Sequence, residues 1–299
     1  MSARVATGAL PVVGGAVLES LYQHRLLSSG QIHRMHMPDA SVRWTRRVLT
    51  GLRRRELVDC LRAADGEGSV YFLTSKGASA VEAIASRTPA RGKPITPEQA
   101  AGPLRAHTLA VNETGIAFMQ AARERGDDFG PLAWQHEIAH PLGTRRGNLL
   151  IADALLSYLR YGDGGELIFE SRLLELDRAT LPTDALAAKL ARYARLYDYA
   201  VAGQSTPAWR ARYAVFPGVL CVLAGQSDTT LKRRTEVVLA LCREDPQLTG
   251  TPEVEISLGL LSDLQRHGPF AAIWQRPGQQ QQVDWLGRPD GHSDERRAK

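Results

Sequence analysis

The chain has 299 residues, 43% of them hydrophobic and 23% charged, with a formal net charge of +5. This length predicts two domains, and the composition is that of a globular protein with substantial apolar cores. No run of about 18 apolar residues occurs, so no transmembrane helix is expected. The cysteines Cys60, Cys221 and Cys242 form no closely spaced pair. This spacing argues against a zinc site and predicts reduced thiols in the cytoplasm.

Residues 10–86 predict a winged helix-turn-helix domain, in which three helices are followed by a β-hairpin and a further helix. Apolar residues recur at helical spacing in the first part, and a Gly-rich turn separates two short apolar runs in the second. The predicted elements are helices over 13–25, after Ser28 or Ser29 and over 41–57, strands over 58–62 and 70–73, and a helix from Thr74 or Ser75.

The third predicted helix is rich in arginine, with no acidic residue between Arg43 and Arg55. In a helix-turn-helix protein the second helix of the motif enters the major groove, and arginine there reads guanine or holds phosphate. The alternative is a solvated basic face on an ordinary helical bundle. The residues that we expect at duplex DNA are Ser41, Arg43, Trp44, Arg46, Arg47, Arg53, Arg54 and, on the wing, Arg62 with the Gly66–Gly68 backbone. Such proteins commonly bind as two-fold dimers, so a homodimer is expected.

The rest of the chain predicts a linker, a second domain and a tail. Residues 87–103 are rich in Pro, Gly and Arg, which is typical of a linker. Residues 104–276 begin with an amphipathic helix and then alternate strands and helices, which predicts an α/β domain with a mixed central sheet. Residues 277–299 are rich in Gln and charged residues and predict a disordered tail.

Two carboxylates, Glu175 and Asp177, stand two residues apart in the segment LELDRAT. On a strand they point to the same side of the sheet. They form either a site for metal or DNA contact or a structural ion pair, neutralised by Arg172, Arg178 or Lys189. A second motif, HEIAH over 136–140, fits the HExxH zinc spacing, but its surroundings predict a strand, whereas that motif needs a helix.

Together with the N-terminal helices and hairpin, several segments of the second half resemble the replication-relaxation proteins, which occur mainly in actinobacteria and their plasmids or integrative elements. These segments are HTLAVNE, WQHE, ADALL, LELDRAT with the following KLARY, FPGVLCVL and GPFAAIW. The resemblance covers about residues 10–275. It implies plasmid replication or DNA relaxation, and it is most specific in LELDRAT and KLARY. For the chain as a whole we expect a role in replication, transfer or transcriptional control.

The second half also resembles the restriction-endonuclease-like domains of the PD-(D/E)xK kind. In that fold an Asp on one strand and a Glu on the next hold Mg²⁺, and a Lys two residues after the Glu positions water. Asp153 matches the Asp, although Ala152 replaces the usual Pro, and Glu175 matches the Glu. Asp177 stands where the Lys is expected. The resemblance therefore implies Asp153 and Glu175 as metal ligands and Asp153, Glu175, Asp177 and Lys189 as the catalytic set, with Lys189 or Arg178 replacing the missing Lys and Glu137 as a further ligand.

The sequence thus predicts a sequence-specific, double-stranded DNA-binding protein of a plasmid or mobile element. The alternative is a Mg²⁺-dependent endonuclease or nickase that the winged helix directs to its target. A zinc peptidase built on HEIAH is the third possibility.

Overall fold

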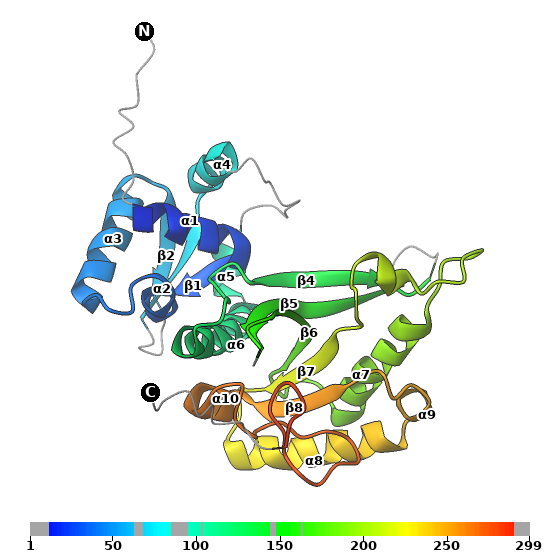
Figure 1. Ribbon diagram of the computed structural model, residues 1–299. Helices are drawn as coiled ribbons and strands as arrows, with labels where there is room; N and C mark the ends of the chain where they lie inside the picture. Colours follow the sequence, from blue (N-terminus) through cyan, green and yellow to red (C-terminus); the bar gives the residue numbers. More distant parts are fainter. Residues whose placement is uncertain are drawn as a thin grey trace. The chain divides into compact units, whose positions relative to one another are not determined.

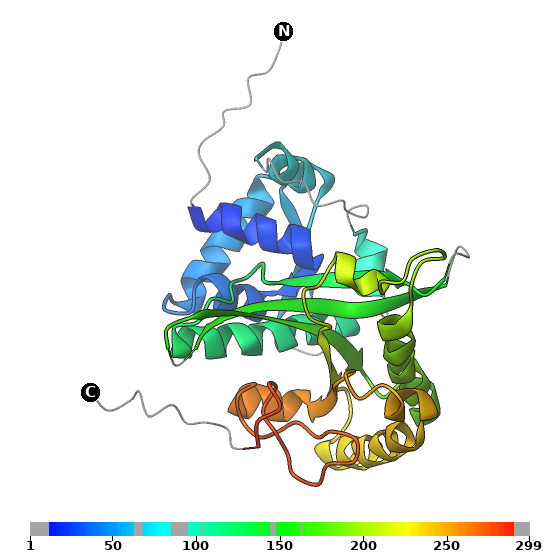
Figure 2. The same ribbon diagram turned by 45° about the vertical axis from the view of Figure 1, so that its right-hand side comes forward.

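The computed structural model describes residues 12–62, 68–84, 95–102, 104–143, 148–162 and 164–289 (Figures 1 and 2). The chain divides into two compact units, Met1–Asn112 and Glu113–Lys299, and the division falls within one helix. Each unit has its own sheet. The prediction of a mixed α/β protein is therefore confirmed. Within the described ranges, no helix is both long enough and apolar enough to span a membrane.

The first unit contains the helices and the hairpin in the predicted order. Ser28 caps the second helix through a capping box with Gln31, and the Ser41 side chain accepts a hydrogen bond from the Trp44 N–H at the start of the third. A short strand that the sequence analysis missed completes a three-stranded antiparallel sheet of order β1-β3-β2. The elements are α1 (Val12–His24), β1 (Leu26–Ser28), α2 (Ser29–His36), α3 (Val42–Arg54), β2 (Val58–Arg62), β3 (Ser69–Leu73), α4 (Ser75–Ile84) and α5 (Pro97–Ala101).

Part of the predicted linker is built into this first unit. Residues 85–94 and 103 lie outside the described residues, but Thr96 caps the short helix α5. Ala100 of α5 is buried in an apolar cluster with Leu26, Val70 and Phe72. The segment 95–102 therefore packs against the sheet, because it offers a capped turn of helix and a small apolar side chain.

The second unit is built around a five-stranded mixed sheet of order β4-β5-β6-β7-β8. The first three strands form an antiparallel meander, and helical connections then make β7 and β8 parallel to β6. The elements are α6 (Leu104–Arg125), β4 (Trp134–Pro141), β5 (Leu149–Tyr161), β6 (Leu167–Asp177), α7 (Thr183–Asp198), the 3₁₀ turn η1 (Ala208–Ala211), β7 (Gly218–Leu223), α8 (Asp228–Glu244), α9 (Pro246–Thr249), β8 (Ile256–Leu260) and α10 (Leu261–His267).

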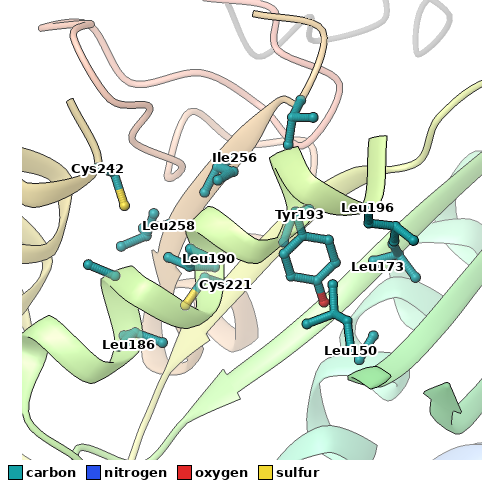
Figure 3. Packing of buried hydrophobic residues seen from close by; sticks show 14 of the residues in the cluster. Leu150, Leu173, Leu186, Leu190, Tyr193, Leu196, Cys221, Cys242, Ile256 and Leu258 are labelled. Atoms are coloured by element: carbon teal, nitrogen blue, oxygen red, sulfur yellow. The ribbon is translucent and has the colours of Figure 1, made fainter. Parts of the chain in front are cut away.

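The two faces of this sheet carry different cores. One face packs against α7 and α8 in an aliphatic core, in which Tyr193 lies among leucines such as Leu150, Leu173 and Leu196 (Figure 3). The other face carries an aromatic cluster, in which Trp285 contacts Phe118 of α6 and Tyr158 of β5, each at a ring-centroid distance of 5.1 Å. Trp134 and Trp274 are also buried in the core.

The prediction of a disordered tail from residue 277 is wrong as far as residue 289. Val283 exchanges backbone hydrogen bonds with Trp274, and Trp285 is 1% exposed. The buried Asp284 carboxylate accepts hydrogen bonds from the Leu286 and Arg288 N–H groups and from the Arg288 guanidinium. Burial of these apolar side chains outweighs the polar composition of the segment. Residues 290–299 lie outside the described part of the chain.

Candidate functional site

The candidate site lies where β6 separates from β5. The last antiparallel pair is Ala154 with Leu174, and β6 then continues alongside β7. At the next position the Asp153 carboxylate accepts a hydrogen bond from the Leu176 N–H at 2.7 Å through Oδ2. At this position a hydrogen bond from the Leu176 N–H to the Asp153 side chain takes the place of a backbone hydrogen bond between the strands. Asp153 and Glu175 therefore lie opposite each other on neighbouring strands. The fold thus brings the two predicted metal ligands together, and their role as ligands stays a prediction.

Glu137 lies opposite Asp153 on the other neighbouring strand. His136 pairs with Ala154 and Ile138 with Ala152, while the pairing is interrupted at Glu137, whose φ is +54°. A positive φ is uncommon for a residue other than glycine and is worth attention near a candidate site. Glu137 is exposed. By register it therefore lies beside the carboxylate pair, and its role as a further ligand stays a prediction.

Helix α7 supplies two polar side chains to Glu175. Lys189 and Tyr193 are four residues apart and so share one face of the helix. The Tyr193 hydroxyl donates a hydrogen bond of 2.5 Å to Glu175 Oε1, and the Lys189 ammonium donates to Oε2. Lys189 Nζ also lies 3.8 Å from Asp153 Oδ1. The ammonium therefore bridges both carboxylates, and Lys189 reaches the pair from the helix.

Burial sets the protonation of this cluster. Glu175 is 1% exposed, and burial together with the Asp153 charge raises the pKa of Glu175 to about 8. Burial lowers the pKa of Lys189, but Glu175 and Asp153 more than offset this effect, so that its pKa is raised and it stays charged. Burial, with a smaller contribution from Glu175, raises the pKa of Tyr193 well above its usual value and keeps it a donor.

Asp177 belongs to a different set of contacts. Arg234 of α8 holds it through Nε at 2.5 Å and through a second nitrogen at 3.2 Å, and donates a further bond to the Leu181 carbonyl. Asp177 Oδ1 also accepts from the Ala179 N–H. These bonds fix the loop between β6 and α7. The structure thus joins Asp153, Glu175 and Lys189, while Asp177 pairs with Arg234, and Arg172 pairs with Glu170.

Two carboxylates suit a hard divalent cation. Mg²⁺ is commonly held by one or two carboxylates, with water and phosphate oxygens completing its coordination. Asp153 and Glu175 fit this donor set. Within the described ranges, no group of three or more His, Cys, Asp or Glu side chains is arranged to hold a metal ion.

The HEIAH motif lies on strand β4, as its surroundings predicted. His140 is buried and lies 2.8 Å from the Tyr213 hydroxyl through Nε2. Burial, aided by Arg212, lowers the pKa of His140 to about 4. The strand does not present the two histidines as one turn of a helix would, so the arrangement of an HExxH peptidase is not formed here.

Sequence reasoning missed two residues of this region. A tyrosine on an apolar helix face usually packs, so the sequence does not predict the hydrogen bond from Tyr193 to Glu175. Its position four residues after Lys189, within KLARY, was the available signal. Arg234 lies 57 residues after Asp177 in the sequence, and no local pattern links the two.

The second candidate region is the outer face of α3. Thr45, Leu49 and Leu52 are buried, and Arg43, Arg47 and Arg54 lie on the opposite face at helical spacing. Ser41 forms the N-cap, and Arg53 lies 3.6 Å from Asp59. All eight side chains predicted to contact DNA are exposed: Ser41, Arg43, Trp44, Arg46, Arg47, Arg53, Arg54 and Arg62. Of the predicted wing backbone Gly66–Gly68, Gly66 and Glu67 lie outside the described residues.

Comparison with known proteins gives one family. Three solved structures of ZitR variants from Lactococcus lactis match at 18–21% identity, with a TM-score of 0.22. These matches cover 25–28% of this chain and 53–56% of the ZitR chain, so the chain spans about half the length of the protein it matches. No curated protein matches the chain. The replication-relaxation family matches residues 18–210, about two thirds of the sequence and both candidate regions. The chain therefore belongs to the replication-relaxation family.

Proposed function

We propose that this protein binds double-stranded DNA through α3, with the first unit acting as a winged helix-turn-helix domain. The observation that carries the proposal is the basic outer face of α3, on which Arg43, Arg47 and Arg54 follow one another along the helix. Arginine pairs bidentately with guanine and with phosphate. A helix that presents a line of such groups matches the dimensions and the charge of the major groove.

The way in which α3 is held supports this proposal. Leu49 and Leu52 anchor the inner face, and His33 Nδ1 of α2 lies 2.8 Å from the Thr45 hydroxyl of α3. The arginines therefore project from a fixed helix rather than from a loop. Arg53 is partly engaged by Asp59, so we expect it to contribute less than Arg43 or Arg47.

The family supports the wider setting. Replication-relaxation proteins are linked by their name to replication, and we propose that this chain acts in replication, transfer or transcriptional control of a plasmid or mobile element. We also propose that it recognises a specific sequence and binds as a homodimer, because two-fold dimers are a common solution for helix-turn-helix proteins.

Removal of three arginines tests the DNA-binding proposal. In the variant with Arg43→Ala, Arg46→Ala and Arg47→Ala, the affinity for a duplex selected from a random pool should fall about a hundredfold or more, since each base contact contributes ~1–3 kcal/mol. The salt slope of log K should also become shallower by about 0.9 for each phosphate that the variant no longer neutralises. Fluorescence anisotropy over a salt series measures both quantities.

A control variant that loses the same formal charge on another helix separates contacts made by α3 from an effect of net charge. Lys232, Arg233 and Arg243 are exposed on α8, and replacing all three by Ala removes the same formal charge. This control should bind close to wild type. Equal loss of affinity in both variants would mean that only net charge matters, and unchanged binding in the α3 variant would refute the assignment of α3.

A second candidate function is cleavage of the bound DNA by the second unit, which we propose to be restriction-endonuclease-like. The specific observation is that Lys189 bridges Asp153 and Glu175, although Asp177 stands at the usual Lys position. A divalent cation at this pair would polarise a phosphate oxygen and ease ionisation of water. Asp153 and Glu175 would hold that ion, Tyr193 fixes one oxygen of Glu175, and Lys189 can hold a phosphate oxygen or orient water.

Supercoiled plasmid with Mg²⁺ or Mn²⁺ tests this second candidate. We expect nicking or linearisation by the wild type, and its loss in Asp153→Asn, Glu175→Gln and Lys189→Met. Glu170→Gln alters a carboxylate on the same strand outside the cluster and serves as the matched control. Tight, salt-sensitive binding without cleavage by the wild type would contradict the nuclease and leave DNA binding intact.

A further inference from the structure

Gly51 is a glycine that the fold of the first unit does not explain. It lies inside α3, is exposed, and does not have a positive φ. A Cβ built there would meet no other atom within 4 Å. In an exposed helix interior, glycine is less stabilising than alanine, because it loses more backbone freedom on folding. For stability alone, alanine would be the better residue at this position.

Two other helical glycines have a packing reason, whereas Gly15 of α1 has open space around a built Cβ, as Gly51 does. A Cβ at Gly77 of α4 would lie 1.9 Å from the Leu57 carbonyl oxygen, and one at Gly115 of α6 would lie 2.5 Å from the Trp134 ring. These glycines permit close approach within the fold. Gly51 provides the same open backbone, but toward the outside of the unit.

The surroundings of Gly51 indicate what approaches it. Arg47 lies four residues before it and Arg54 three residues after it, so both flank it on the helix surface. The glycine therefore leaves a gap in the basic face, where the helix backbone is uncovered between two cations. A polyanion is the complementary partner for such a gap.

We propose that one sugar-phosphate strand of duplex DNA lies directly against the α3 backbone at Gly51, between Arg47 and Arg54. This inference rests on the proposed DNA-binding function. The N-terminal half of a recognition helix reaches the bases, so the tenth of the 13 residues of α3 meets the flanking backbone of the groove. Close approach there brings phosphate within reach of both arginines.

The test replaces Gly51 by Ala. The added methyl group stabilises the helix but separates the two surfaces, so the melting temperature should rise slightly while DNA affinity falls about tenfold, equivalent to ~1.4 kcal/mol. Gly15→Ala in α1 is the matched control, because a Cβ there also meets nothing within 4 Å. It should raise the melting temperature and leave DNA affinity unchanged.

The outcomes separate this inference from the proposal on which it rests. Binding by Gly51→Ala that equals wild type, in a protein whose arginine variant binds poorly, would overturn the close approach at Gly51 alone. A lower melting temperature for Gly51→Ala would also overturn it, because the glycine would then serve the fold. No DNA binding by the wild type would overturn both proposals.

Discussion

The buried carboxyl group of Glu175 predicts a specific dependence of stability on pH. Its pKa rises from an ordinary value of 4.5 to about 8 in the folded chain, chiefly because it is buried and also because Asp153 is close. Between these two values the folded state holds a proton that the unfolded state has lost. Stability contributed by this group is therefore full below pH 4.5 and falls as the pH rises toward 8. At 1.36 kcal/mol per pKa unit the loss is ~5 kcal/mol at most.

Glu175→Gln removes this titration while keeping the shape and an acceptor for the Tyr193 hydroxyl. The stability of the variant relative to wild type should therefore rise by a few kcal/mol, ~5 at most, between pH 5 and pH 9. Urea unfolding followed by tryptophan fluorescence suits this measurement, because four of the five tryptophans lie in the second unit. Glu170→Gln on the same strand, measured in parallel, corrects for the loss of one carboxylate from β6. A stability difference that does not change with pH would refute the reasoning.

Two further predictions concern side chains that the fold holds in place. Trp285→Ala should lower the free energy of unfolding by ~3–5 kcal/mol, because the side chain is fully buried. The control Trp44→Ala, on the exposed face of α3, should change the free energy of unfolding by less than about 0.5 kcal/mol. Equal effects of the two substitutions in urea denaturation would contradict the inclusion of residue 285 in the core. Arg234→Met should lower the free energy of unfolding by ~3–5 kcal/mol, because it leaves the Asp177 carboxylate buried without its cation. Adding Asp177→Asn should restore part of that stability. No recovery in the double variant would show that the ion pair does not cause the destabilisation.

Elements with a strong apolar period could be predicted from the sequence. The stripe of Thr45, Leu49 and Leu52 defines α3, and the six-residue apolar run of β7 is buried throughout. Short elements whose stability comes from distant partners could not be predicted from the sequence. The three residues of β1 are a strand because they pair with β3 and because Asn112 donates a hydrogen bond to the Leu26 carbonyl. No local signal contains that information.

The candidate site could be predicted from the sequence only in part, because some of its contacts join segments that are distant in the sequence. Asp153 and Glu175 each lie within an apolar segment that predicts a strand, so their positions were visible in the sequence, and Lys189 was visible as a nearby cation. The neutralisation of Asp177 could not be predicted, because its partner Arg234 lies on α8, which follows β7 in the sequence. The tail was misjudged because composition averages over a segment, whereas one tryptophan with a complementary aromatic cluster decides whether the segment packs.

The two carboxylates of β6 differ in how firmly each holds its cation. Arg234 is 11% exposed, engages both oxygens of Asp177 and also binds a backbone carbonyl, so its exchange for another ligand would break several buried bonds. Lys189 is 32% exposed and is held by charge at the end of a flexible side chain. Lys189 is therefore the more easily displaced of the two cations, although Glu175 itself is buried. Asp177 is thus neutralised by Arg234 of α8, whereas Glu175 is paired with the ammonium of Lys189 from α7.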